Sequence, residues 1–113
     1  MITLFHNPRC SKSRQALALL EEVGAEVRLR RYLDDPLDAA ELEALVQRLE
    51  GSVSALVRRN ETEWKQLGAD AEDPRQVIDA IVTHPRILQR PIADDGRRAI
   101  IGRPPEAIRA LLD

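Results

Sequence analysis

The first 30 residues contain a strand, a helix and a second strand, in a length that fits one parallel crossover unit. Residues 2–5 form a short apolar run typical of a buried strand. Residues 11–23 carry apolar side chains at helical spacing, and Gly24 suits the left-handed conformation that often ends a helix. Residues 27–30 alternate aliphatic side chains with Arg, the period of a strand. This order predicts two parallel strands in one sheet, with the helix packed on one face.

The middle of the chain, about residues 38–84, is predicted to be an all-helical block. Asp38 followed by Glu41 matches a capping box, and the residues after it are apolar at i, i+3, i+4 and i+7. Asp73 and Pro74 are typical of a second helix start, which we expect to run to His84. Shorter helices are expected over residues 52–59 and 63–67.

The last part of the chain predicts a β-hairpin and a final helix. Residues 90–93 and 97–101 favour strands, joined by a turn at residues 94–96, and the final helix follows Pro104 and Pro105. The whole order predicts an α/β protein with a four-stranded mixed sheet flanked by helices, the helical block being inserted before the hairpin. At 113 residues the chain is expected to form one domain, residues 1–113.

Composition excludes several classes of function. The net charge of -2 argues against general affinity for nucleic acid, which needs a basic excess. The chain has no apolar stretch long enough to cross a membrane, so we expect no membrane partner. One cysteine cannot form an internal disulfide, which favours a reducing cytoplasm as the location. Two histidines and one cysteine do not make a convincing zinc set, so no metal site is expected.

Cys10 is the residue most suited to chemistry. It stands where a strand ends and a helix begins, and unpaired N–H groups at a helix start favour a thiolate. A lone cysteine is more often a small buried hydrophobe. Its neighbours in sequence are Arg9, Ser11 and Lys12, and polar and charged residues of this kind rarely flank a core residue. The positive charges would also help the thiol to ionise.

Other candidates have both a structural and a functional interpretation. Arg58 could lie on a solvated helix face, and His6 could either contact Cys10 or hold the loop by bonding to backbone. Arg90 and Arg103 each precede a proline, which favours extended backbone and fixes where the side chain projects.

Four motifs occur in an order that resembles a known family. They are His-Asn-Pro-x-Cys-x-x-Ser-Arg at residues 6–14, Leu-Val-Arg-Arg-Asn at 56–60, His84-Pro85 with Arg90-Pro91-Ile92, and Ile-Gly-Arg-Pro at 101–104. Together they resemble the ArsC family of glutaredoxin-linked arsenate reductases, and the residues of the first and last motifs are especially similar to those of its YfgD-like branch. The resemblance implies a thioredoxin-like (glutaredoxin-like) fold with a helical insertion and the reduction of arsenate to arsenite.

The resemblance also implies roles for individual residues. Cys10 matches the family's nucleophile, and His6 and Ser13 match positions that assist the thiolate. Arg58, Arg90 and Arg103 match three arginines that bind the oxyanion. Glutathione would be a cosubstrate and glutaredoxin the protein partner, with no bound cofactor.

Two other functions remain open at the level of sequence. A glutathione-dependent monothiol oxidoreductase acting on mixed disulfides would keep the thiol but not need the three arginines. A regulator of the Spx type would share the fold and bind RNA polymerase, but such regulators sense oxidation through a Cys-x-x-Cys pair, and here the second position is Ser13.

Overall fold

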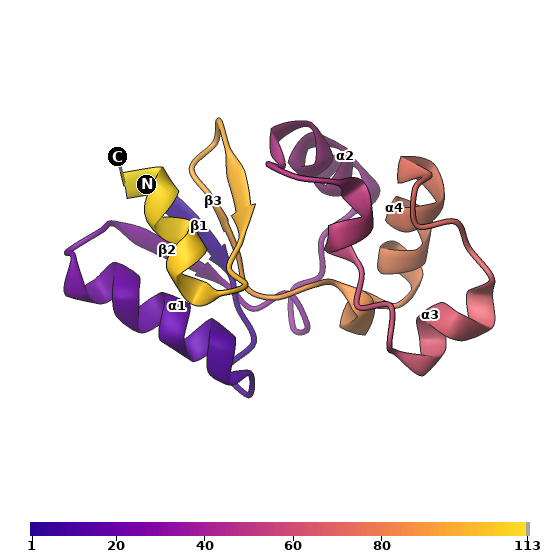
Figure 1. Cartoon of the computed structure of the whole chain (residues 1–113), viewed down its shortest axis with the longest axis horizontal. Helices are drawn as coiled ribbons and strands as arrows, with labels where there is room; N and C mark the ends of the chain where they lie inside the picture. The colour runs from indigo at the N-terminus through magenta and orange to yellow at the C-terminus, as the bar shows by residue number, and fades with distance from the viewer. Residues whose placement is uncertain (113) are drawn as a thin grey trace.

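The computed structural model describes residues 1–112, which form a four-stranded mixed sheet flanked by helices (Figure 1). The strands are β1 (Ile2–Phe5), β2 (Val27–Arg30), β3 (Ile92–Asp94) and β4 (Ala99–Ile101), in the order β2-β1-β3-β4. β1 pairs in parallel with β2 and antiparallel with β3, and β3 pairs antiparallel with β4. The predicted fold class is confirmed.

One face of the sheet is covered by α1 (Ser11–Glu22) and by η3 (Pro105–Leu112). Leu4 and Ala93 of the central strands meet Leu20 of α1 and Ile108 of η3 in a fully buried cluster. The alternation of side chains along a strand sends Phe5 and Ile92 to the opposite face, where they join the core of the helical insertion. The two cores are therefore separated by the central strands.

The insertion lies beside the sheet and lengthens the molecule to 41 Å (Figure 1). Its elements are α2 (Ala39–Arg48), η1 (Val53–Leu56), α3 (Thr62–Leu67), α4 (Pro74–Thr83) and η2 (Pro85–Ile87). The predicted capping box is present, since the Asp38 carboxylate accepts from the Glu41 amide and Glu41 bonds back to the Asp38 amide. Trp64 is buried in the core of the insertion.

An ion pair fixes the insertion to the sheet. The guanidinium of Arg48, at the end of α2, donates two hydrogen bonds to the carboxylate of Asp94 in β3, at 3.0 and 2.6 Å. The two residues after α2 also cover the edge of β4, because Leu49 forms a β-bridge with Ala99 and the Glu50 amide donates to the Ala99 carbonyl. The β4 edge is thus paired, as sheet edges usually need to be.

The structure corrects two predicted elements, the helix over residues 52–59 and the hairpin turn. Residues 52–59 do not form a helix: a short 3-10 turn ends at Leu56, and Val57 then pairs with Leu88 in an antiparallel β-bridge. Val57 is 3% exposed, and its extended backbone with a partner strand segment suits a buried β-branched residue. Asp94 belongs to a strand, and the turn falls on the next four residues, closed by the Asp95 amide on the Arg98 carbonyl.

The ends of two helices also differ from expectation. α1 ends at Glu22, so Val23 is the cap and is largely exposed. The final helix is present but has 3-10 geometry. Within residues 1–112, no helix has the length and apolar character needed to cross a membrane.

Candidate active site

Cys10 is the N-cap residue of α1 and ends a tight turn that begins at Asn7. The Cys10 amide donates to the Asn7 carbonyl at 3.0 Å, and the Arg14 guanidinium holds the same turn from outside through the Pro8 carbonyl at 2.9 Å. Only 9% of the Cys10 surface is exposed. The sulfur is therefore nearly covered, but its neighbours are a helix start and cations instead of aliphatic side chains.

The surroundings of Cys10 favour the thiolate. Burial on its own would raise the pKa of the thiol, but the Ser13 amide, the charge of Arg90 and the Lys12 amide outweigh that effect. The Arg90 guanidinium lies close enough to the sulfur to favour its charged form, and the net pKa of Cys10 lies below its ordinary value. A larger fraction of Cys10 is ionised at neutral pH than of an ordinary cysteine.

His6 and Ser13 contact each other beneath the loop. The Ser13 hydroxyl lies 2.6 Å from Nδ1 of His6 and accepts a hydrogen bond from the Asn7 amide at 3.0 Å, and both side chains are buried. Burial, together with the charges of Arg31 and Arg14, lowers the pKa of His6. The imidazole is consequently neutral at pH 7, so it holds the loop in place and adds no positive charge beside the sulfur.

Arg90 and Arg103 are brought together by the close approach of two loops. Each precedes a proline in a cis peptide bond, and Nη1 of Arg103 donates to the Arg90 carbonyl at 2.8 Å. Gly102 lies between them, and its amide donates to the Pro91 carbonyl at 2.9 Å. A Cβ atom at Gly102 would come within 2.8 Å of the Pro91 ring, so only glycine permits this approach.

Arg58 comes from the insertion and is already engaged. The β-bridge at Val57 places it, through a hydrogen bond of 2.7 Å from its amide to the Ile87 carbonyl. Its Nη2 forms an ion pair of 2.6 Å with Glu61, and its Nη1 donates to the Arg86 carbonyl at 3.2 Å. Arg58 is thus not on a solvated helix face, and Glu61 neutralises part of its charge.

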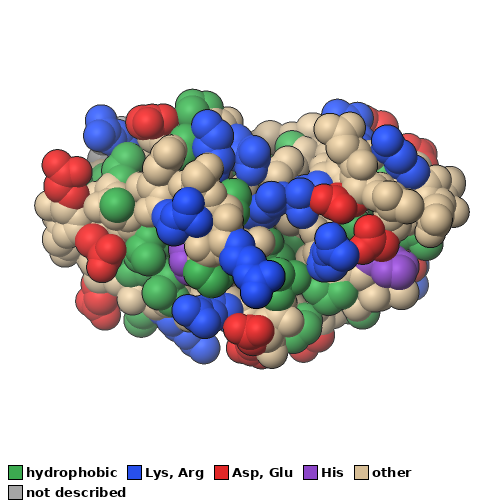
Figure 2. Space-filling view, turned by 90° about the horizontal axis from the view of Figure 1, so that it is seen from below, with side chains coloured by type: hydrophobic (Ala, Val, Ile, Leu, Met, Phe, Trp, Pro, Cys, Tyr) green, Lys and Arg blue, Asp and Glu red, His purple; other side chains and the backbone are tan. Residues whose placement is uncertain are grey.

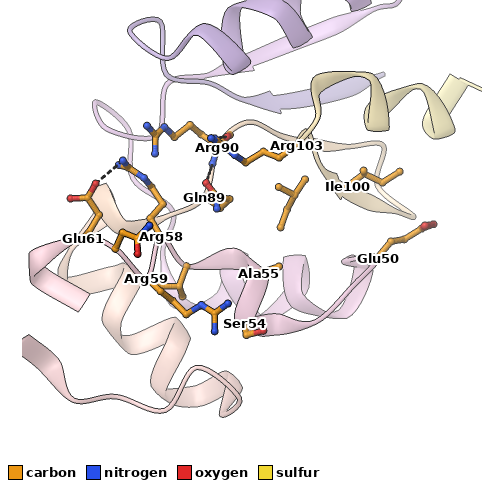
Figure 3. Close-up of a pocket in the computed structure, with 13 residues that line it drawn as sticks. Glu50, Ser54, Ala55, Arg58, Arg59, Glu61, Gln89, Arg90, Ile100 and Arg103 are labelled. Carbon is orange, nitrogen blue, oxygen red and sulfur yellow. Dashed lines mark hydrogen bonds and ion pairs between the residues drawn. The ribbon is translucent and has the colours of Figure 1, made fainter. Parts of the chain in front are cut away.

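These three arginines line one hollow of about 580 Å³, which we call the first hollow (Figure 3). Its wall also includes other residues of the 54–61 and 100–103 segments, with Gln89 and Glu50. Arg58 lies on one side, and Arg90 and Arg103 lie across from it (Figure 3). Nε of Arg90 is buried and, among the described residues, has no hydrogen-bond partner. The predicted arginines therefore meet, and Arg90 links their hollow to the sulfur.

A second hollow, of about 750 Å³, shares Arg58 with the first. It is lined by residues 6–9, residues 31–34, Arg58 and Arg86. Figure 2 views the molecule from below the view of Figure 1, and Lys and Arg side chains gather in the middle of that face. Cys10 itself lines neither hollow. Within residues 1–112, no group of three or more metal-ligating side chains could hold a metal ion.

Comparison with known proteins bears on the whole chain. The model of the ArsC family matches residues 5–111. The chain belongs to the ArsC family. It is 43% identical over 114 aligned positions to a protein of Neisseria meningitidis named arsenate reductase, covering 98% of this chain and 97% of that one. It is also 42% identical to protein YfgD of Escherichia coli strain K12, with 95% and 92% covered.

Solved structures of ArsC relatives have the same fold. A structure described as arsenate reductase from Vibrio cholerae has a TM-score of 0.85 and 36% identity, with 96% of this chain and 95% of that chain covered. A structure described as a putative arsenate reductase from Yersinia pestis has a TM-score of 0.84 and 35% identity, covering 97% of this chain and 99% of that chain.

Two residues beside the ArsC site were not among those predicted from sequence. Tyr32 is 1% exposed and lies near Cys10, Arg90 and the Asn7 side chain, all of which influence the pKa of its hydroxyl; burial dominates and raises that pKa. Glu61 holds Arg58. For Glu61 the sequence does offer a signal, because opposite charges three residues apart, as in Arg58 and Glu61, often pair. For Tyr32 it offers none, because no neighbouring residue distinguishes it from an aromatic residue of the core.

Proposed function

We propose that this ArsC protein is an arsenate reductase that uses Cys10 as its nucleophile, glutathione as cosubstrate and glutaredoxin as protein reductant. The names of its relatives support arsenate as the substrate. The observation that carries the proposal is the position of Arg90, whose charge favours the Cys10 thiolate and whose side chain lines a hollow shared with Arg58 and Arg103. One site thus combines an ionised thiol with three cations for an oxyanion.

Arsenate requires such a site because both reactants are negative. It is mainly a dianion at neutral pH, so a thiolate approaching it is repelled unless cations lie between or around them. Guanidinium groups keep their charge at any working pH, and their forked donors fit the oxygens of a tetrahedral anion. Arg90 and Arg103 line the first hollow together with Arg58, so their guanidinium groups are placed to share the oxygens of one anion.

The proposed reaction balances with two thiols besides Cys10. The Cys10 thiolate attacks arsenic, and one oxygen leaves as water after taking up protons. Glutathione then attacks the same arsenic and displaces a second water, which gives a Cys10-S-As-S-glutathione adduct. A glutaredoxin thiol attacks the glutathione sulfur, so that arsenic is reduced from As(V) to As(III) and glutaredoxin and glutathione form a mixed disulfide. Hydrolysis releases arsenite and restores Cys10.

The chain itself favours external thiols over an internal relay. It has one cysteine, so no second protein thiol can form a disulfide with Cys10. The chemistry needs no bound cofactor or metal, and its dependence on glutathione suits the reducing cytoplasm.

A coupled assay tests this function. Arsenate should cause NADPH consumption when the protein is combined with glutathione, glutaredoxin and glutathione reductase, and Cys10→Ser should abolish it. No arsenate-dependent rate beside an active positive control would reject the proposal. Turnover of a mixed disulfide that survives substitution of Arg58, Arg90 and Arg103 would instead support the monothiol oxidoreductase.

A further inference from the structure

The second hollow has cations that the oxyanion site does not use. Arg9 and Arg31 both line it, both are exposed, and neither guanidinium has a hydrogen bond or ion pair among the described residues. The other two arginines that line this hollow already have carboxylate partners. Arg58 forms an ion pair with Glu61, and Nη1 of Arg86 lies 3.6 Å from Oε2 of Glu63. Two free guanidinium groups on one concave wall are a ready site for two carboxylates.

The hollow also contains a single carboxylate and a covered floor. Asp34 is the one acidic residue that lines it, and the ring of Tyr32 is buried there. Its volume of about 750 Å³ falls within the ~300–1,000 Å³ typical of small-molecule sites. A ligand with two carboxylates and one ammonium group would match this set of charges.

The position of the second hollow relative to the Cys10 sulfur determines which reaction a ligand bound there could take part in. The wall residues 6–9 lead directly into Cys10, and the Tyr32 hydroxyl lies within electrostatic reach of both Cys10 and Arg90. Arg58 lines both hollows, so the two join at that side chain. A ligand held here could therefore extend a thiol toward an arsenic atom held in the first hollow.

We infer that the second hollow binds the cosubstrate thiol, with Arg9 and Arg31 holding the two carboxylates of glutathione and Asp34 facing its ammonium group. This inference rests on the proposed function, because it takes glutathione as the second reactant. It assigns the two anionic reactants to separate hollows that share Arg58. Arsenate and glutathione would then bind at the same time, as the attack on the Cys10-arsenic intermediate requires.

The test uses S-methylglutathione, which keeps both carboxylates and the ammonium group but cannot react. Isothermal titration of the full chain should give saturable binding, weakened about tenfold by Arg31→Gln and by Arg9→Gln, because each variant loses one charge-assisted interaction. Arg28→Gln removes an exposed cation outside both hollows and should leave binding unchanged. In the coupled assay, Arg31→Gln should raise KM for glutathione and leave KM for arsenate unchanged.

Several results would overturn the inference. They are the absence of binding at 50-fold the glutathione concentration used for turnover, equal affinity in wild type and the Arg9→Gln, Arg31→Gln double variant, or displacement of S-methylglutathione by arsenate from the Cys10→Ser protein. Protection of Cys10 from alkylation by arsenate is measured separately. Arginine-dependent S-methylglutathione binding without that protection would defeat arsenate reduction but not this site; the reverse pattern would defeat this site alone.

Discussion

At the scale of single residues, the reactivity of Cys10 comes from a balance of opposing effects. Burial disfavours the thiolate, while the amides of Ser13 and Lys12 and the Arg90 guanidinium favour it. The amides belong to α1 and are fixed by its backbone, whereas Arg90 comes from a loop more than 70 residues away along the chain. Arg90 is therefore the component that a single substitution can remove without disturbing the helix.

Replacing Arg90 should make Cys10 less reactive at neutral pH. Arg90→Gln removes a positive charge from beside the sulfur, so the pKa of Cys10 should rise. The rate of iodoacetamide alkylation against pH reports this pKa directly, because Cys10 is the only cysteine. Arg97→Gln, at an exposed arginine in the hairpin turn, is the matched control. An unchanged pH profile in Arg90→Gln would show that Arg90 does not act on the thiolate.

His6 should make the protein less stable in mild acid. Its pKa in the folded state lies below the ordinary value of 6.5, so below pH 6.5 the unfolded chain binds a proton that the folded chain resists. The free energy of unfolding contributed by His6 is thus fully present above pH 6.5 and is lost as pH falls toward the folded-state pKa. Between pH 7.5 and 5.5, urea unfolding of wild type should lose more free energy than that of His6→Gln, and equal losses would contradict the assignment.

At the scale of elements, the site depends on how loops approach one another. The element order was predictable because hydrophobic periodicity, capping residues and the Asp95-Gly96 turn are local signals. The bridge between Val57 and Leu88 was not, since it depends on a partner some 30 residues away, and a short apolar run suits either a helix or a strand. The same limit applies to the ion pair between Glu41 and Arg30, because the local capping box does not reveal a partner 11 residues away.

Gly102 should be essential for this approach of loops. In Gly102→Ala the new methyl group would meet the Pro91 ring at 2.8 Å and Ile108 at 3.3 Å, which should cost about 1–3 kcal/mol and displace Arg90 and Arg103. The free energy of unfolding in urea should fall, and arsenate should protect Cys10 less well from alkylation. Gly96→Ala, where the new methyl group meets nothing within 4 Å, should affect stability only. Full arsenate protection in Gly102→Ala would contradict the positioning role.

At the scale of the whole molecule, the candidate site spans two parts of the fold. Cys10, Arg90 and Arg103 belong to loops of the sheet, whereas Arg58 belongs to the insertion. The sequence motifs predicted which arginines share the site, but not the contact that fixes the insertion against the sheet. That contact, between Arg48 and Asp94, joins residues 46 positions apart, and neither lies in a recognisable motif.

Breaking the ion pair between Arg48 and Asp94 should lower the free energy of unfolding. Asp94→Asn leaves Arg48 facing a neutral amide at a buried position, which should cost about 2–3 kcal/mol of unfolding free energy in urea. Asp79→Asn, at an exposed carboxylate of α4, should cost less than about 0.5 kcal/mol. A cost for Asp94→Asn no larger than that of Asp79→Asn would show that the ion pair contributes little.

Protection of Cys10 from alkylation by arsenate is the most direct test of whether the three arginines bind the oxyanion beside the thiol. Arg103 and Arg58 are not among the groups that influence the pKa of Cys10, so Arg103→Gln and Arg58→Gln isolate oxyanion binding from thiol ionisation. We predict that arsenate slows alkylation of the wild-type thiol, and that each variant needs about tenfold more arsenate for the same slowing. Alkylation that is indifferent to arsenate in wild type, or that arsenate slows as much in both variants as in wild type, would contradict arsenate binding by these arginines.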